Sequence, residues 1–473
     1  MSETNAEIKN SWLTFKNGQG IELQGVLLSI DRHHVVFELY TPDTVLRTSE
    51  VLTELRVVYQ DRPVYAGRAI VSTLVNTGVM LVCEATLEDP WVDMNLAAAG
   101  NNGDGLEIEF DRFMSEWQKL YRVEPKFKVA VADLQTYLTD LRSWLNQVEV
   151  GIRASPSADR ADLERQLARK LENGVVSAIT NLFDRLEDVA QQLPPEAQSA
   201  HWAYGKRQLH PLLLCSPFVY RTLRKPLGYA GDYEMVNMMF RDPCEGSSLF
   251  AKLVNMYALR LPPIVGHRSR IDYLVDTLEQ ETLASLIRKR PARFYSLGCG
   301  PAHEVQMFLS RPIADHAQFT LVDFNEETLR HTGQKMDALR IQQGRATKLE
   351  FVRKSVQAIL KESSRRNTTA TECYRMVCCA GLFDYLSDKV CRQVVSVLYS
   401  MVEPGGMLVI TNVDRHPSRA EMECFLEWHL IYRNAEELQA LVPADIPREQ
   451  VSHSTQDHGA GVNLFLEIRK PEL

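Results

Sequence analysis

The first ninety residues alternate between hydrophobic and polar side chains in short runs. These runs cover residues 21–29, 33–39, 51–59, 62–72 and 79–85, and Gly, Asp and Asn residues separate them. Alternation with a period of two, interrupted by turn residues, is typical of β-strands. The pattern predicts a small antiparallel β-barrel or sandwich over residues 1–100. The stretch 97–105, rich in glycine and asparagine, predicts a loop or linker.

Further along the chain, the spacing of apolar residues changes to a helical period. Apolar side chains recur at alternating steps of four and three over residues 127–148, and a second apolar stripe covers residues 163–189. The break between them, at residues 151–156, predicts an antiparallel helical hairpin within residues 106–200. Two roles stay open for this segment, namely packing within one chain or dimerisation through its helices.

From residue 204 to the end, a helical lead-in is followed by strands that alternate with helices. The predicted strands are 293–297, 319–323, 349–352, 374–379 and 407–412, and the helices between them include 303–310, 326–342 and 390–401. This rhythm predicts βαβ units in a parallel sheet. Two final runs, 449–454 and 462–469, predict an antiparallel hairpin at the edge of that sheet. We therefore expect an α/β domain over residues 204–473, with a helical lid at 204–290.

Composition and charge narrow the class of protein. The chain has 473 residues with a net charge of −8, and this acidic balance disfavours bulk binding of nucleic acid. No apolar run approaches the ~20 residues that span a bilayer, and the first residues do not resemble a signal peptide. We therefore expect a cytoplasmic protein with no integral membrane segment. The nine cysteines have no metal-ligand spacing, so no metal site is predicted, and Cys378 and Cys379 are expected in a buried strand.

The most informative motif is a glycine turn that joins a predicted strand to a predicted helix. Gly298, Cys299 and Gly300 form this turn, where small residues let backbone amides approach a ligand. The next strand ends in Asp323, where a carboxylate can bind both hydroxyls of a ribose. An N-terminal cap for the following helix is the alternative role for Asp323. His303 stands where a dinucleotide-binding turn has its third glycine, which argues against a pyrophosphate.

Two later motifs extend this pattern. The segment Leu382–Leu386 (LFDYL) follows the fourth strand, and Glu403–Asn412 (EPGGMLVITN) enters the fifth. In this order the motifs resemble class I S-adenosylmethionine-dependent methyltransferases over about residues 293–470. The resemblance implies a Rossmann-like seven-stranded sheet and S-adenosylmethionine as cofactor. The cofactor-binding residues it implies are Gly298, Cys299, Gly300, Glu304, Asp323, Phe324, Ser355, Ala380 and Gly381. Ser296 and Ala302 depart from the family, which often has an acidic residue and a glycine there.

A loop upstream of the sheet is rich in glycine and tyrosine, a composition typical of a binding lid. Its sequence, KPLGYAGDYE at residues 225–234, and the later FLEWHLIYRN at 425–434 resemble bacterial methyltransferases of the 3-hydroxypalmitic acid methyl ester biosynthesis type. The resemblance implies that Tyr229, Asp232 and Tyr233 are catalytic residues beside the acceptor. It also implies transfer of a methyl group to an oxygen of a small, fatty-acid-like molecule, and that oxygen is expected to belong to a carboxylate.

The chemistry of the acceptor decides which further residues are needed. A carboxylate is already anionic at neutral pH and needs no base, and Arg268 and Arg270 are candidates to pair with it. A solvated helix face is the alternative role for these arginines. A hydroxyl acceptor would need a base, for which His210, His303, His429 and His453 are candidates.

Two other functions stay open. The departures at Ser296 and Ala302 favour a non-catalytic module that senses a metabolite or binds a protein, and the acidic charge balance suits a protein methyltransferase with a basic substrate.

The N-terminal segment resembles PilZ domains in its strand spacing, but residues 28–34 lack intact cyclic di-GMP motifs. We therefore expect it to serve as an interaction or dimerisation module, with a homodimer through this or the helical segment as one arrangement.

Overall fold

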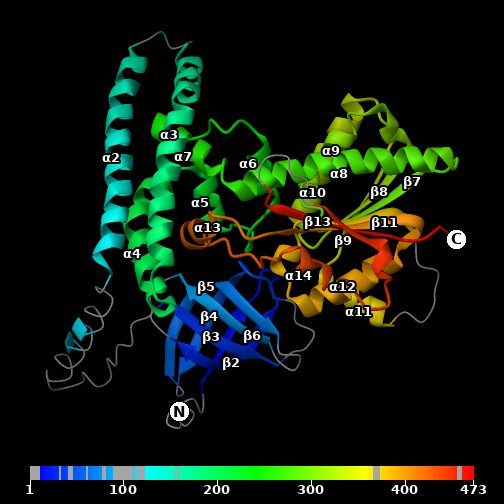
Figure 1. Cartoon of the computed structure of the whole chain (residues 1–473), viewed down its shortest axis with the longest axis horizontal. Coiled ribbons are helices and arrows are strands. Elements are labelled where there is room, and N and C mark those ends of the chain that lie inside the picture. Colours follow the sequence, from blue (N-terminus) through cyan, green and yellow to red (C-terminus); the bar gives the residue numbers. More distant parts are fainter. Residues whose placement is uncertain are drawn as a thin grey trace.

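The computed structural model contains a small barrel, a long helical hairpin and a mixed α/β sheet (Figure 1). It describes residues 11–88 and 123–472, except for 31–32, 41–45, 60–61, 77–80, 155, 157–158, 366–372 and 455–460, together with 110–111 and 114–115. The predicted linker at 97–105 lies outside the described residues.

The N-terminal strands close into an antiparallel barrel in the order β1-β2-β3-β6-β5-β4. Their bounds are β1 Trp12–Lys16, β2 Glu22–Ile30, β3 His34–Leu39, β4 Val51–Tyr59, β5 Arg62–Asn76 and β6 Leu81–Leu87. Inward-facing apolar residues such as Leu13, Phe37 and Val57 fill the barrel. The sequence pattern left β1 unassigned, and β6 lies two residues later than predicted.

The predicted helical hairpin is present as α2 (Pro125–Arg153) and α3 (Arg160–Gln191), followed by α4 (Pro195–Leu213). The α2 helix continues through Gly151, since one glycine near a helix end costs only about 1 kcal/mol. The apolar stripes of α2 and α3 belong to one core that also includes residues of α7 and α13. Intramolecular packing therefore accounts for both stripes, and dimerisation stays a prediction.

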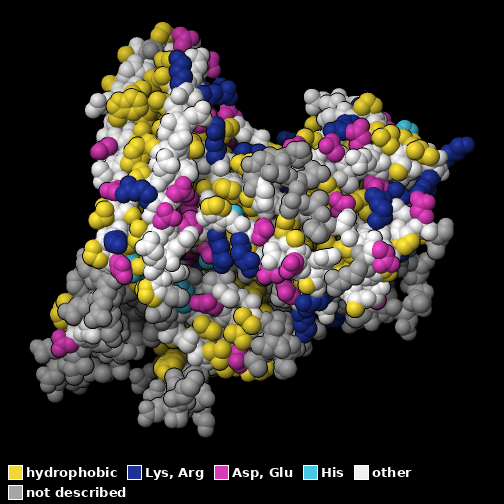
Figure 2. All heavy atoms as spheres, in the orientation of Figure 1, with side chains coloured by type: hydrophobic (Ala, Val, Ile, Leu, Met, Phe, Trp, Pro, Cys, Tyr) yellow, Lys and Arg dark blue, Asp and Glu magenta, His cyan; other side chains and the backbone are white. Residues whose placement is uncertain are grey.

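Four further helices lead into the sheet: α5 (Pro217–Arg224), α6 (Tyr233–Phe240), α7 (Leu249–Ala258) and α8 (Pro262–Ile287). No helix among the described residues is long and apolar enough to cross a membrane. On the face seen in Figure 2, Lys and Arg side chains lie among Asp and Glu side chains. That mixture differs from the basic stripe typical of nucleic-acid binders.

The C-terminal sheet has seven strands in the order β12-β13-β11-β10-β7-β8-β9. They are β7 Ala292–Leu297, β8 Ala317–Asp323, β9 Lys348–Arg353, β10 Tyr374–Cys379, β11 Val402–Val413, β12 Val451–Ser454 and β13 Asn463–Arg469. The strands β7 to β11 pair in parallel, whereas β13 pairs antiparallel with both β11 and β12. The predicted parallel sheet with a reversed edge is therefore confirmed, and it is the Rossmann-like arrangement that the resemblance implies.

Helices cover both faces of this sheet (Figure 1). Side chains of α8, α9 (His303–Phe308) and α10 (Glu326–Gln342) pack on one face. Side chains of α11 (Val356–Arg365), α12 (Asp388–Ser400) and α14 (Ala435–Gln439) pack on the other, and α13 (Arg419–Phe425) joins the helical core. Cys378 and Cys379 are buried in β10, as predicted.

Candidate functional site

A cavity lies at the carboxyl ends of β7, β8 and β10, where ligands bind in open α/β sheets. The predicted glycine turn forms part of its wall. Gly298 and Cys299 donate backbone hydrogen bonds to the carbonyl oxygen of Val322, at 2.8 and 3.0 Å. Gly298 and Gly300 have φ of +68° and +52°, which glycine adopts without strain. A Cβ added to Gly300 would meet no atom within 4 Å, so the turn faces open space.

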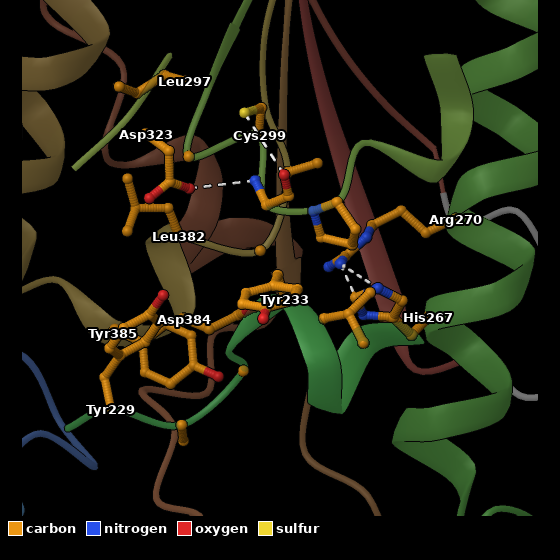
Figure 3. A pocket seen from close by; sticks show the side chains of 18 of the residues that line it. Tyr229, Tyr233, His267, Arg270, Leu297, Cys299, Asp323, Leu382, Asp384 and Tyr385 are labelled. Atoms are coloured by element: carbon orange, nitrogen blue, oxygen red, sulfur yellow. Dashed lines mark hydrogen bonds between the residues drawn. The ribbon is translucent and has the colours of Figure 1, made fainter. Parts of the chain in front are cut away.

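Asp323 stands at the end of β8, directly against this turn (Figure 3). Its Oδ2 accepts from the backbone N–H of Gly300 at 3.1 Å, and its Oδ1 accepts from that of Asn325 at 2.9 Å. The side chain is 7% exposed. Burial raises the pKa of Asp323, and these two hydrogen bonds oppose the shift. The carboxylate is thus held at a fixed place beside the glycine turn.

Glu304 and Arg270 line the cavity from two helices. Glu304 lies in the first turn of α9, and burial raises its pKa to about 7. Arg270, on α8, points into the cavity from the side opposite Asp323 and donates to the ring of His267, with Nη2 2.7 Å from Nδ1 (Figure 3). The Nε of Arg270 is buried and has no hydrogen-bond partner among the residues that the structure describes. Arg268 does not line the cavity, and its Nε donates to the carbonyl of Met239 at 2.7 Å.

The predicted catalytic residues have different surroundings. Tyr229 and Tyr233 line the cavity, and Tyr233 donates to Glu327 at 2.9 Å. Burial and this carboxylate raise the pKa of Tyr233 to about 12. Asp232 is not among the described residues that line the cavity. Its carboxylate caps the N-terminus of α6 and forms an ion pair with Arg221 at 2.9 Å.

Of the remaining predicted cofactor residues, Cys299, Phe324, Ala380 and Gly381 line the cavity, but Ser355 does not. The Ser355 hydroxyl accepts from the backbone N–H of Ala358 at 3.2 Å at the start of α11. Its role in the described structure is therefore that of a cap, while its neighbours Lys354 and Val356 reach the cavity.

Ser296 and Ala302, the two residues that depart from the family pattern, both lie beside the cavity. Ala302 adopts a left-handed conformation with φ of +48° at the start of α9, which explains why a glycine suits this position. Ser296 lies buried at the cavity wall, next to Cys378 on the neighbouring strand, with 3.6 Å between Oγ and Sγ.

The histidine candidates are spread over the molecule. Among the candidates whose side chains the structure describes, only His303 lines the cavity. Burial lowers the pKa of His303 to about 4, and its Nε2 lies 3.0 Å from Asn237 Oδ1. His210 lies against the carbonyl of Phe425 at 3.0 Å, and His453 is in the edge strand β12. Among the described residues, no group of His, Cys, Asp and Glu side chains could hold a metal ion.

The cavity also has walls that the sequence reasoning missed. Asp384 and Tyr385 come from the segment after β10, and Trp428, Leu430 and Asn463 come from the C-terminal part. Asp384 Oδ1 accepts from the backbone N–H of Val413 at 2.7 Å. The least expected contributors are Arg47 and Thr48 of the barrel. They stand between predicted strands, where no periodic signal points to a ligand.

Residues 46–51 hold the barrel against the wall of the cavity, and we call them the docking segment. The N–H of Val51 donates to the carbonyl of Gly228 at 2.7 Å, next to Tyr229. Ser49 exchanges two hydrogen bonds with the backbone of His429, one donated by its hydroxyl at 2.9 Å and one accepted at 2.5 Å. The barrel is therefore part of the site's wall.

Comparisons with known proteins give only distant likenesses. No family model matches the chain, and no curated protein matches it in sequence. A solved structure of a "possible exported protein" from Bordetella parapertussis is 17% identical, with 67% of this chain and 99% of that chain covered and a TM-score of 0.38.

Two solved methyltransferases are similar over about half of the chain. The N-methyltransferase NodS from Bradyrhizobium japonicum WM9, in complex with S-adenosyl-L-homocysteine, is 15% identical, covers 51% of this chain and 98% of its own, and has a TM-score of 0.30. Magnesium protoporphyrin IX methyltransferase from Synechocystis PCC 6803, with bound S-adenosylhomocysteine, is 13% identical. It covers 44% of this chain and 84% of its own, with a TM-score of 0.31. Likenesses this distant carry no argument about function.

Proposed function

We propose that the chain binds S-adenosylmethionine and transfers its methyl group to a carboxylate oxygen of a small acceptor with an apolar body. One observation carries the proposal: the Gly298–Gly300 turn, backed by the anchored carboxylate of Asp323, faces a cavity at the carboxyl edge of the sheet. Amides at such a turn and a carboxylate on the next strand are the groups that a nucleoside cofactor requires.

The residues around the cavity fit this cofactor. Open space in front of Gly300 leaves room for a ligand against the backbone. Asp323 keeps lone pairs for ribose hydroxyls, because each of its carboxylate oxygens accepts one hydrogen bond from a backbone amide. Glu304 is suited to the amino group of the methionine part, and the guanidinium of Arg270, which also lines the cavity, is suited to its carboxylate. When bound, S-adenosylmethionine supplies an electrophilic methyl group.

The acceptor side of the cavity is suited to an apolar carboxylate. Val236, Met239, Ile271, Leu430 and Trp428 contribute apolar wall. Burial raises the pKa of both Tyr229 and Tyr385, so their hydroxyls stay protonated and able to donate hydrogen bonds. A carboxylate is ionised at neutral pH, so these residues need only orient it and exclude water. The low pKa of His303 makes it a poor base for a hydroxyl acceptor near pH 7.

Several finer expectations stay predictions. These are the 3-hydroxypalmitic acid methyl ester subtype, the PilZ-like nature of the barrel, a homodimer and a cytoplasmic location. The domain bounds 1–100, 106–200 and 204–473 are likewise proposals.

Isothermal titration with S-adenosylhomocysteine tests the cofactor. The full-length protein should bind it, and Asp323→Ala should weaken binding about tenfold to a hundredfold, since a hydrogen bond to a charged group contributes roughly 1.5–3 kcal/mol. Asp337→Ala removes an exposed carboxylate from α10 and should leave the affinity unchanged. Failure of the wild-type protein to bind would refute the proposal. Binding without any transfer of labelled methyl to lysate metabolites would favour the sensing module instead.

A further inference from the structure

Arg47 is a cation of the barrel that is buried at the cavity. Its side chain is 8% exposed, and Cζ lies 4.4 Å from the centre of the Phe324 ring. Among the described residues, the structure gives this guanidinium no hydrogen-bond acceptor and no ion-pair partner. Asp323 and Glu50 are the neighbouring carboxylates, and the charge of Arg47 opposes the rise that burial causes in the pKa of each. Both carboxylates nevertheless accept hydrogen bonds from backbone N–H groups and not from this guanidinium. A buried guanidinium without an acceptor is costly unless a ligand supplies one.

Thr48 adds a second unpartnered group at the same place. Its side chain is 4% exposed, and its buried Oγ1 atom has no hydrogen-bond partner in the described part of the chain. Its backbone N–H donates to the carbonyl of Tyr385 at 3.3 Å, which fixes the residue against the cavity wall. Arg47 and Thr48 both line the cavity, and within the described part of the chain neither the guanidinium nor the hydroxyl has a hydrogen-bond partner.

The docking segment is built to hold these two side chains in place. Buried Glu50 accepts from the backbone N–H groups of Gly18 and Arg47, both at 2.8 Å. Ser49 takes a left-handed conformation, with φ of +59°, while it exchanges hydrogen bonds with His429. A strained segment held by these hydrogen bonds is a fixed feature of the site, because the surrounding contacts must outweigh the cost of the strain.

We propose that Arg47 and Thr48 bind the carboxylate of the methyl acceptor, so that the barrel completes the active site. This inference rests on the proposed function. Arg47 can offer two parallel N–H donors to a carboxylate, and Thr48 can offer one hydroxyl. The cofactor itself carries a net positive charge and has no need of a further cation. Tyr229, which contacts the same Phe324 ring at a centroid distance of 5.0 Å, lies next to this carboxylate site.

Binding of a matched anionic and neutral ligand tests the proposal. Decanoate and 1-decanol are titrated into the full-length protein saturated with S-adenosylhomocysteine. We expect the wild-type protein to bind decanoate at least tenfold more tightly than decanol, and Arg47→Met to abolish that preference. Arg47→Lys should keep part of it, and Thr48→Val should reduce it severalfold. Arg56→Met, on the exposed face of the same barrel, should behave as the wild type.

Titration of S-adenosylhomocysteine alone, together with thermal unfolding, distinguishes failure of the proposed function from failure of the carboxylate site. If the wild-type protein does not bind S-adenosylhomocysteine, the proposed function is wrong. If it binds the cofactor product but shows no preference for decanoate, or if Arg47→Met keeps the preference, the carboxylate site is wrong. An Arg47→Met protein that is folded but has lost affinity for S-adenosylhomocysteine as well would place Arg47 at the cofactor and overturn the inference.

Discussion

Glu304 should make cofactor binding depend on pH in a direction that the structure fixes. Burial raises the pKa of this carboxyl from an ordinary 4.5 to about 7, so it is neutral in acid and ionised in mild alkali. With that pKa, roughly a tenth of the side chains are ionised at pH 6 and roughly nine tenths at pH 8. If only the ionised form pairs with the amino group of the ligand, affinity for S-adenosylhomocysteine should rise about tenfold between these values.

The same shift has the opposite effect on the unliganded protein. A raised carboxyl pKa means that the folded state binds more protons than the unfolded state, so stability is lost as pH rises from 4.5 towards 7. The loss is on the order of 3 kcal/mol. Glu304→Gln cannot ionise and should therefore be more stable than the wild type at pH 8 while binding the ligand more weakly.

Isothermal titration at pH 6, 7 and 8 and urea unfolding at pH 8 measure the two effects. The Glu304→Gln protein is the control for the titration of the ligand's own amino group. The reasoning about Glu304 is refuted if wild-type affinity is flat across this range, or if Glu304→Gln shows the same slope.

Three other substitutions test parts of the fold. Ala302→Gly should raise the free energy of unfolding by about 1 kcal/mol in urea, because it relieves a left-handed alanine at φ +48°; an unchanged midpoint would contradict the strain. Arg433→Met should lower the free energy of unfolding by about 3 kcal/mol, since the Arg433 guanidinium donates to the carbonyls of Phe383 and Leu386 at 2.8 and 2.7 Å. A loss below 1 kcal/mol would argue against a structural role for Arg433. Ser49→Ala should lower the melting temperature by several degrees, because two hydrogen bonds to the docked backbone are lost, and no shift would mean that these bonds add no net stability.

The parts of the fold that follow from local pattern were predictable from the sequence. The strand β10 and the helix α10 have the predicted bounds, because an apolar run and an amphipathic helix each have a clear period. The strand β1 was missed because five residues carry too little alternation to stand out. The glycine turn and Asp323 were found because their spacing reflects a local strand–turn–helix geometry.

The remaining cavity residues depend on tertiary contacts that no local pattern reveals. Arg47 and Thr48 reach the cavity only because the barrel docks on a loop near residue 228 and a segment near residue 429. The family resemblance implies a catalytic role for Asp232, and that role stays a prediction. In the structure its carboxylate caps α6, the role that an aspartate before a helix often has.

The docking of the barrel also constrains the order in which the protein can fold. The hydrogen bonds between Ser49 and His429 join residues 380 positions apart. The barrel strands are contiguous in sequence and can pair while the chain is still being synthesised, whereas the cavity needs Arg47 and Asn463 together. Closing so long a loop is an entropic cost met only when the C-terminal half has folded. In refolding experiments, the barrel should therefore gain structure before the protein regains the ability to bind its ligand.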